Sequence, residues 1–221
     1  MKIGLFDSGL GGTTILAAVK NLLPNEEYKY IADSKNCPYG EKSDEELQKI
    51  VTSNVETLKK WGAKIIVIAC NTATTRCISY LRDKYPELIF VGTEPAIKLA
   101  TKTNTKNILV MATPGTIESE RTKLLLKENQ RPGQTIKLLP CAGLADTIEH
   151  FYNSPDHTPI IDCLRKLLQD IDFTPEIIVL GCTHYSLIKE LIQPFFKTAV
   201  LIDGNQGVAE EVKTMLQAIQ K

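Results

Sequence analysis

The stretch Lys64-Ile-Ile-Val-Ile-Ala-Cys70-Asn-Thr72 decides the fold, because it returns in altered form as Glu176-Ile-Ile-Val-Leu-Gly-Cys182-Thr-His184. Each copy is an apolar run with the length and β-branched content of a buried strand, and each ends in cysteine. A second pair follows the same division, since Ile3-Gly-Leu-Phe-Asp-Ser8 resembles Ile108-Leu-Val-Met-Ala-Thr113. The pattern predicts two related halves, although Ile/Val runs are common enough for two buried strands to resemble each other by chance.

Other apolar runs alternate with amphipathic stretches along the 221 residues, which is typical of β–α–β units in a parallel sheet covered on both faces. We expect strands at residues 2–6, 28–32, 64–69, 89–91, 107–111, 135–139, 177–180 and 199–202. We expect helices at residues 12–22, 43–61, 75–84, 96–101, 117–127, 144–152, 160–170, 187–194 and 206–218. The predicted class is α/β, with two similar doubly wound domains, parallel sheets, and an active site in the cleft between them.

Charge and hydropathy exclude several kinds of partner. Lys+Arg and Asp+Glu both number 26, and no block of like charge builds the field that favours nucleic acid or an anionic lipid surface. The N-terminal apolar run is too short for a signal peptide, and no stretch approaches a membrane span. We therefore expect a cytoplasmic protein that binds neither nucleic acid nor membranes.

Six cysteines occur, and for each the simplest interpretation is a small buried hydrophobe. Cys70 and Cys182 differ from the others because each follows an echoing strand and precedes a helix. Ligands of open α/β sheets bind at that edge, and a nearby helix N-terminus favours the thiolate. Cys37, Cys77, Cys141 and Cys163 keep the structural interpretation.

Two thiols that face each other across a substrate suggest a reaction in which one removes a proton from carbon and the other delivers a proton to the opposite face. Asn71 and Thr72 follow the first cysteine, and Thr183 and His184 follow the second. Their hydroxyl, amide and backbone N–H groups suit a small carboxylate. Such an inversion of a stereocentre needs no cofactor, and we expect none and no metal.

Several motifs in order now support a family. The chain resembles the glutamate racemases of the cofactor-independent aspartate/glutamate racemase superfamily, and the resemblance covers nearly its whole length. The motifs are Asp7-Ser-Gly-Leu-Gly-Gly12, Asp33 through Pro38-Tyr39-Gly40, Ala69-Cys70-Asn-Thr-Ala73, Glu94-Pro-Ala96 and Gly181-Cys182-Thr-His-Tyr185. The histidine after Cys182-Thr183 makes the chain resemble the glutamate racemases, because aspartate racemases usually carry glutamate at this position.

The resemblance implies proton exchange at Cα of glutamate, supplying D-glutamate for peptidoglycan and so for cell wall biogenesis and cell shape. It implies that Cys70 takes the proton from the D-enantiomer and Cys182 from the L-enantiomer. It further implies acid–base helpers at Asp7, His184 and Glu149. The implied substrate-binding positions, which include two of these helpers, are Asp7, Ser8, Pro38, Tyr39, Gly40, Asn71, Thr72, Thr113, Thr183 and His184.

Simpler roles stay open for the helpers. Asp7 could cap the glycine-rich turn that follows it. His184 could be a buried structural histidine, as we expect of His150 and His157. Glu149 could lie on a solvated helix face.

The resemblance also implies a homodimer, a first domain of residues 1–95 plus 204–221, and a second domain of residues 96–203. Family members usually continue with a further strand and helix past the position where this chain stops. Relatives usually show a Gly-Thr turn where this chain has Met111-Ala-Thr113, which keeps the hydroxyl. A non-catalytic module that clamps a small dicarboxylate between two halves is the competing interpretation, although a pure binder has no need of matched cysteines.

Overall fold

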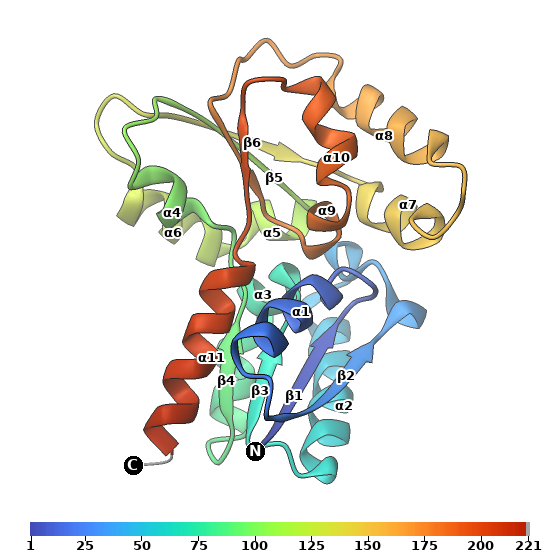
Figure 1. Cartoon of the computed structure of the whole chain (residues 1–221), viewed down its shortest axis with the longest axis vertical. Coiled ribbons are helices and arrows are strands. Elements are labelled where there is room, and N and C mark those ends of the chain that lie inside the picture. The colour runs from blue at the N-terminus through green and yellow to red at the C-terminus, as the bar shows by residue number, and fades with distance from the viewer. Residues whose placement is uncertain (220–221) are drawn as a thin grey trace.

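The computed structural model describes residues 1–219, which form two parallel four-stranded sheets with helices on both faces of each (Figure 1). The strands of the first sheet are β1 (Lys2–Asp7), β2 (Glu27–Ala32), β3 (Ile65–Ile68) and β4 (Ile89–Gly92). Those of the second sheet are β5 (Asn107–Ala112), β6 (Thr135–Pro140), β7 (Ile177–Leu180) and β8 (Val200–Ile202). All eight predicted strands are present, and the predicted α/β class is confirmed.

The two sheets have the same topology. Their strand orders are β2-β1-β3-β4 and β6-β5-β7-β8, and all neighbouring strands are parallel. The two echoing strands of the sequence are therefore β3 and β7, which hold equivalent places. Likewise β1 corresponds to β5. The repeat is a real structural duplication and the alternative of chance resemblance between buried strands is wrong.

Helices follow the strands, and their bounds complete the fold. In the first half lie α1 (Thr13–Leu22), η1 (Ser34–Asn36), η2 (Tyr39–Glu41), α2 (Asp44–Trp61) and α3 (Asn71–Lys84). In the second half lie α4 (Ile97–Thr101), α5 (Pro114–Glu118), α6 (Glu120–Asn129), α7 (Leu144–Phe151), α8 (Thr158–Leu168), α9 (Thr183–Leu187), α10 (Lys189–Ile192) and η3 (Gln193–Phe195). The last helix, α11 (Asn205–Ile219), returns to the first sheet.

Local sequence explains where the longest helix begins and ends. The Ser43 hydroxyl accepts a hydrogen bond from the backbone N–H of Glu46 at the N-terminus of α2, and three acidic residues occupy its first turn. Both features satisfy or complement the exposed N–H groups of a helix start. At the other end Gly62 adopts φ 95°, a left-handed conformation that glycine tolerates without strain.

Two predicted helices are interrupted. The stretch predicted as one helix at residues 117–127 is α5 and α6, because Ser119 is extended and its hydroxyl starts a new helix by accepting from the N–H of Thr122. The stretch predicted at residues 187–194 is divided among the end of α9, α10 and η3. Its break falls at Ile188, whose φ of −113° and ψ of 26° are not helical.

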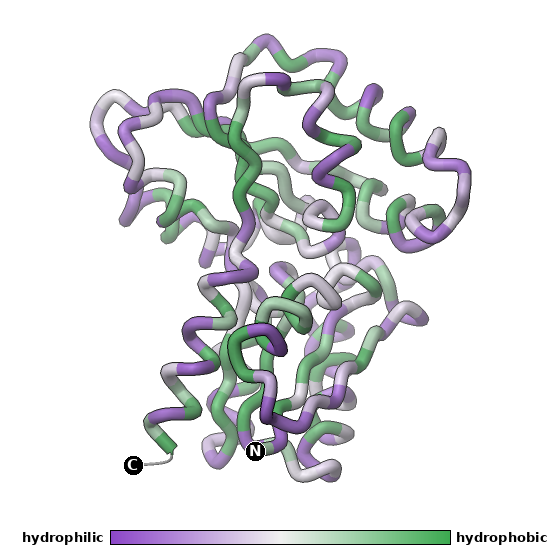
Figure 2. Tube along the Cα trace, viewed as in Figure 1, coloured by the Kyte–Doolittle hydropathy of each residue, from purple (hydrophilic) through white to green (hydrophobic). Residues whose placement is uncertain are grey.

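Each sheet is buried on both faces, which matches the continuous apolar strands (Figure 2). In the first sheet, α2 and α3 pack on one face, whereas α1 and α11 pack on the other. In the second sheet, α7, α8, α9 and α10 cover one face, and α4 and α6 cover the other. Within residues 1–219 no helix is both long and apolar enough to cross a membrane.

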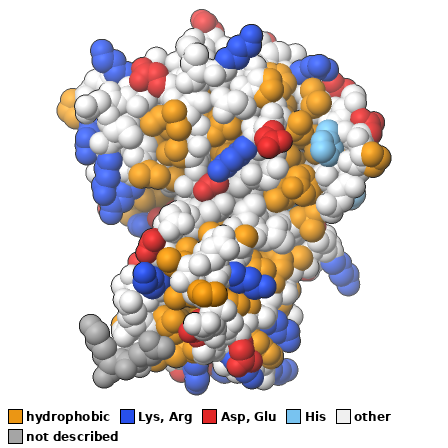
Figure 3. Space-filling view, viewed as in Figure 1, with side chains coloured by type: hydrophobic (Ala, Val, Ile, Leu, Met, Phe, Trp, Pro, Cys, Tyr) orange, Lys and Arg blue, Asp and Glu red, His pale blue; other side chains and the backbone are white. Residues whose placement is uncertain are grey.

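A narrower waist separates the two halves in the space-filling view, and side chains of both charges occur on each half of that face (Figure 3). The strand order reverses direction between β1 and β3 in the first sheet and between β5 and β7 in the second. Ligands of open α/β sheets bind beyond the carboxyl ends of strands at such switch points. The topology therefore directs attention to the residues that follow these four strands.

Candidate active site

Cys70 and Cys182 occupy equivalent positions, each two residues beyond the end of its strand, β3 or β7. Each cysteine is extended and is the N-cap of the helix that follows, α3 for Cys70 and α9 for Cys182. The sequence predicted these helices to begin at residues 75 and 187, but they begin at Asn71 and Thr183. The predicted starts were late because the short polar residues after each cysteine are typical of loops. The earlier starts place each thiol at a helix N-terminus.

The Cys70 thiol lies in a buried acidic environment. It is 5% exposed, and its Sγ is 3.9 Å from the hydroxyl oxygen of Ser8. Burial raises the pKa of Cys70 well above its usual value, and the nearby Asp7 and Cys182 raise it further. Hydrogen bonds from the backbone of Ala73 and from Ser8 act in the opposite direction. These surroundings favour the neutral thiol of Cys70, and the influence of Cys182 on its pKa shows that the two thiols are near each other.

Asp7 ends β1 and is fully buried between the two halves. Its Oδ2 accepts the backbone N–H of Gly12 at 2.6 Å and the hydroxyl of Thr183 at 3.2 Å. Burial raises the pKa of Asp7, although the charge of His184 and these hydrogen bonds oppose the rise. Its Oδ1 has no hydrogen-bond partner among the described residues. Asp7 thus caps the glycine-rich turn with one oxygen and keeps the other available, so the two interpretations are compatible.

Cys182 lies beside His184. Its Sγ is 3.9 Å from Nδ1 of His184, whose Nε2 is 2.8 Å from Oε2 of Glu149. His184 is only 1% exposed. Burial would lower the pKa of His184, but hydrogen bonds with Cys182, Cys37 and Glu149 raise it well above its usual value. The imidazole is therefore held as a cation between a carboxylate and a catalytic thiol candidate.

Glu149 joins the two halves. It projects from α7, and its carboxylate accepts the backbone N–H of Leu10 at 2.8 Å and the hydroxyl of Ser34, both in the first half. Burial alone would raise the pKa of Glu149, but hydrogen bonds from His184, Leu10 and Ser34 outweigh it and lower the pKa to about 2. The side chain is 9% exposed. The alternative that Glu149 lies on a solvated helix face is wrong.

Three threonine hydroxyls meet across the halves. Thr72 Oγ1 is 2.9 Å from Thr113 Oγ1 and 3.1 Å from Thr116 Oγ1, and the latter two are 3.0 Å apart. All three residues are buried. The sequence did not predict Thr116 as a site residue. It could have been found only from its position three residues after Thr113, which places its hydroxyl one helical turn from that N-cap residue. The cluster offers donors that a carboxylate could use in place of these mutual hydrogen bonds.

Residues 38–40 contribute differently from one another. The Tyr39 hydroxyl donates to Asp33 Oδ2 at 2.6 Å and accepts from the side-chain amide of Asn54 at 3.0 Å, so it is engaged within the first half. Gly40 approaches the second half closely, because a Cβ there would lie 3.0 Å from Cβ of Thr113. Pro38 precedes η2 and is half-buried. Asn71, also buried, has its amide 3.5 Å from the carbonyl of Thr93.

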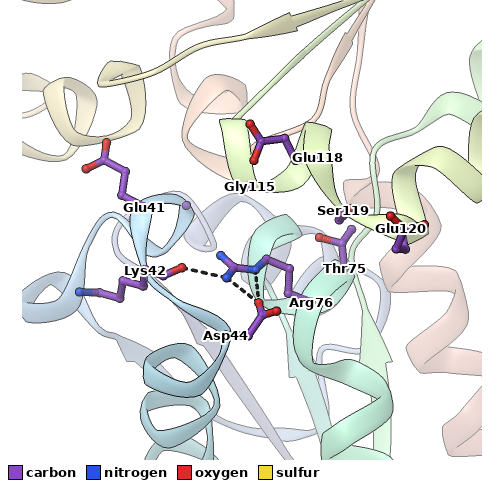
Figure 4. Close-up of a pocket in the computed structure, with 10 residues that line it drawn as sticks. Glu41, Lys42, Asp44, Thr75, Arg76, Gly115, Glu118, Ser119 and Glu120 are labelled. Atoms are coloured by element: carbon purple, nitrogen blue, oxygen red, sulfur yellow. Dashed lines mark hydrogen bonds and ion pairs between the residues drawn. The ribbon is translucent and has the colours of Figure 1, made fainter.

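A cavity of about 560 Å³ opens beside the contact of Gly40 with the second half. It lies between η2 and α3 of the first half and α5 of the second (Figure 4). Within it Arg76 forms an ion pair with Asp44 and donates to the carbonyl of Lys42 at 2.8 Å. Neither thiol lines this cavity. Both thiols are instead buried beneath the surface, and Cys182 is 7% exposed.

The remaining cysteines and histidines fall into two groups. Cys77 and Cys141 are buried in the cores, and Cys163 is half-buried against the core of the second half. His150 and His157 bond to backbone carbonyls of neighbouring turns. Cys37 differs, because its sulfur and the side chains of Glu149 and His184 each offer a ligand atom within 4.8 Å of the other two. Nothing in the local sequence distinguished Cys37, since its neighbours in the site are more than 100 residues away along the chain.

A family model described as Asp/Glu/Hydantoin racemase matches residues 13–212. A glutamate racemase of Clostridium botulinum is 41% identical over 218 residues, which is 97% of this chain and 83% of that protein. A glutamate racemase of Fusobacterium nucleatum is 38% identical over 220 residues, which is 97% of this chain and 81% of that protein.

Solved structures of glutamate racemases are similar throughout. The Escherichia coli enzyme in complex with L-glutamate and the activator UDP-MurNAc-Ala has a TM-score of 0.89 at 29% identity, covering 98% of this chain and 82% of that one. The Francisella tularensis enzyme in complex with D-glutamate has a TM-score of 0.81 at 29% identity, covering 99% and 82%. An aspartate racemase of Picrophilus torridus, 15% identical with a TM-score of 0.63, shares the fold.

Proposed function

The chain belongs to the Asp/Glu/hydantoin racemase family, and from this premise we propose that it is a glutamate racemase, an isomerase that interconverts L- and D-glutamate. The names of relatives about 40% identical over nearly the whole chain support glutamate as the substrate. One observation carries the mechanism: Cys70 and Cys182 are the N-caps of the helices that follow equivalent strands of a duplicated fold, and they share one buried site.

The reaction is a proton exchange at Cα. One cysteine, as thiolate, takes the Cα proton, and the electron pair left on carbon is delocalised into the adjacent carboxylate. The other cysteine, as thiol, donates its proton to the opposite face of the same carbon. The enzyme then differs only in which sulfur carries the proton, and the reverse reaction restores it. We assign Cys70 to the proton of D-glutamate and Cys182 to that of L-glutamate.

Each thiol has its own acid–base neighbour. Asp7 lies near Cys70, and its raised pKa and unpartnered Oδ1 suit a group that accepts a proton from a thiol or holds the substrate ammonium. His184 lies beside Cys182, with its Nδ1 3.9 Å from the sulfur, where it can pass a proton to or from that thiol. Glu149 keeps His184 charged and oriented. These three are therefore assigned as helpers, with Glu149 acting through His184.

The polar groups around the thiols would bind the substrate. Carboxylate oxygens of glutamate would accept hydrogen bonds from the hydroxyls of Ser8, Thr72, Thr113 and Thr183 and from the amide of Asn71. Pro38, Tyr39 and Gly40 would contribute backbone and shape, because the Tyr39 hydroxyl is bonded to Asp33. Desolvation in this closed interior strengthens every such interaction.

We place the protein in the cytoplasm as a homodimer that supplies D-glutamate for peptidoglycan, without a cofactor or a metal in the reaction. We propose domains of residues 1–95 plus 204–221 and 96–203. The contacts of α11 with α1, β3 and β4 support the inclusion of residues 205–219 in the first domain. Residues 220–221 lie outside the described residues.

Circular dichroism tests the activity directly, by following the loss of ellipticity from pure D- or pure L-glutamate. The wild-type protein should racemise both, and in D₂O the product enantiomer should carry deuterium at Cα. Cys70→Ser and Cys182→Ser should each lower the rate by about 10²–10⁴-fold, the usual contribution of a general acid or base. Cys163→Ser is the matched control, since Cys163 is a half-buried cysteine on α8.

Three outcomes separate the possibilities. Racemisation of glutamate that depends on both thiols supports the proposal. A double variant that still racemises at the wild-type rate refutes the two-thiol mechanism. Glutamate binding without any exchange of the Cα proton would instead identify a binding module.

A further inference from the structure

Cys37 completes a group of three metal-ligating side chains that spans the two halves. Cys37 lies between η1 and η2, Glu149 lies on α7 and His184 lies on α9. Each offers one ligand atom, and these atoms are within 4.8 Å of one another. His184 is buried, and the other two are partly buried. The proposed reaction has no use for Cys37, yet the thiol lies against both helpers of Cys182.

We propose that Cys37, His184 and Glu149 form an inhibitory binding site for a borderline-soft divalent cation of the zinc class. Thiolate sulfur, imidazole nitrogen and carboxylate oxygen are the three ligand types that Zn²⁺ takes in proteins, usually with water as a fourth ligand in an open site. Hard cations such as Mg²⁺ and Ca²⁺ prefer oxygen ligands alone. The presence of both sulfur and nitrogen therefore selects the zinc class.

Movement of the ligand atoms needed to bind the ion is small. Zinc–ligand bonds are about 2.0–2.3 Å long, so two ligands of one ion lie about 3–4 Å apart. Oε2 of Glu149 is already 2.8 Å from Nε2 of His184, whereas Cys182 lies on the other side of the ring at 3.9 Å from Nδ1. An ion that uses Glu149 therefore binds on the Nε2 side, and Cys37 rather than Cys182 supplies the sulfur.

Occupancy has two consequences for the site. The ion takes the place of the proton on Nε2 and of the Cys37 thiol proton, and both protons are released to solvent. The ion then replaces the 2.8 Å hydrogen bond between Nε2 of His184 and Oε2 of Glu149, which orients the ring beside Cys182. The ion also links Cys37 of the first half to α7 and α9 of the second, which restrains movement of one half relative to the other. Inhibition of racemisation rests on the proposed function, whereas metal binding does not.

Cobalt spectroscopy and zinc calorimetry on the full-length, chelator-treated protein test the site. Co²⁺ bound to a thiolate gives a charge-transfer band in the near ultraviolet, and Zn²⁺ binding can be titrated directly. The wild-type protein and the control Cys163→Ser should bind one ion with the thiolate band. Cys37→Ser should lose the band and bind Zn²⁺ at least about tenfold more weakly. Cys182→Ser should keep the band.

Zn²⁺ should also protect Cys37 of the wild-type protein from alkylation, as mapped by mass spectrometry, which needs no variant. If circular dichroism shows that Cys37→Ser is unfolded, Cys37→Ala replaces it in the metal titrations, and the protection of wild-type Cys37 tests the same ligand. A band that survives in Cys37→Ser, or that disappears in Cys182→Ser, overturns the proposed ligand set, as does an absence of zinc binding.

The activity measurement is separate. Zn²⁺ should inhibit the wild-type enzyme and Cys163→Ser, and Cys37→Ser should need at least about tenfold more Zn²⁺ for the same fractional inhibition of its own rate. Cys37-dependent binding without inhibition refutes the regulatory half of the proposal. If the metal-free protein does not racemise glutamate, the proposed function fails, and the cobalt and zinc titrations still decide the metal site.

Discussion

Glu149→Gln should destabilise the protein, because Glu149 is the charged link between α7 and the first half. Its pKa falls from 4.5 to about 2, and each unit of pKa corresponds to about 1.4 kcal/mol. The full difference is about 3 kcal/mol, which is an upper limit because glutamine can still accept from the Leu10 N–H. We expect a loss of about 2 kcal/mol in the free energy of unfolding at pH 6. Urea denaturation followed by circular dichroism measures it.

The pH dependence gives this prediction its sign. A lowered pKa means that the carboxylate stabilises the folded protein above pH 4.5, and that this contribution is lost as the pH falls towards 2. The raised pKa of His184 stabilises the folded protein below 6.5 and is lost as the pH rises through its folded value. The difference between wild type and Glu149→Gln should therefore be largest between about pH 4.5 and 6.5.

The control is Glu128→Gln, which alters an exposed residue on α6 and should change stability by less than about 0.5 kcal/mol. A loss for Glu149→Gln that is equal at pH 3 and pH 6 would refute the electrostatic reasoning. So would a loss no larger than that of the control.

Three further substitutions each test one local feature of the structure: a close backbone approach, a helix position and a buried hydrogen bond. Gly11→Ala should reduce kcat/KM by at least about tenfold with the fold retained, because the added Cβ would lie 2.5 Å from the backbone N of His184. Racemisation followed by circular dichroism measures this, and an unchanged rate would contradict the close approach. Gly207 lies in α11 with open space around it, so Gly207→Ala should stabilise the protein by about 0.5–1 kcal/mol. The melting temperature should therefore rise, and a decrease would contradict the prediction. Tyr39→Phe should cost about 1–3 kcal/mol in unfolding experiments, because Asp33 loses a buried donor, yet leave KM for glutamate nearly unchanged; a large rise in KM would show that the hydroxyl contacts substrate.

The parts of the fold that could be predicted from the sequence are those that depend on neighbouring residues in the chain. The strands β3 and β7 are continuous apolar runs, so both their existence and the position of the cysteine after each could be predicted. The helix breaks at Ser119 and Ile188 were missed for different reasons. Ser119 is a good N-cap residue, but serine also occurs within helices, so a single serine does not fix a helix start. Ile188 lies in an apolar stretch that carries no glycine or proline to mark the break.

Contacts between the halves were beyond local patterns. The environment of Cys37 depends on α7 and α9, and the same packing buries Glu149, whose helix position alone fits a solvated face equally well. Thr116 likewise joins Thr72 only because α5 meets α3. Each of these residues received its role from the docking of two sheets that the sequence predicted separately.

The return of α11 to the first sheet has a consequence for synthesis on the ribosome. Val208, Val212 and Leu216 pack with Ile3, Leu5 and Ile15 in one apolar cluster. A chain elongating at about 5–20 residues per second therefore leaves this face of β1 and β3 without α11 for roughly 7–40 s after those strands are made. During that interval the nascent first sheet exposes the part of its apolar face that α11 covers in the complete fold, and only α1 packs on that face.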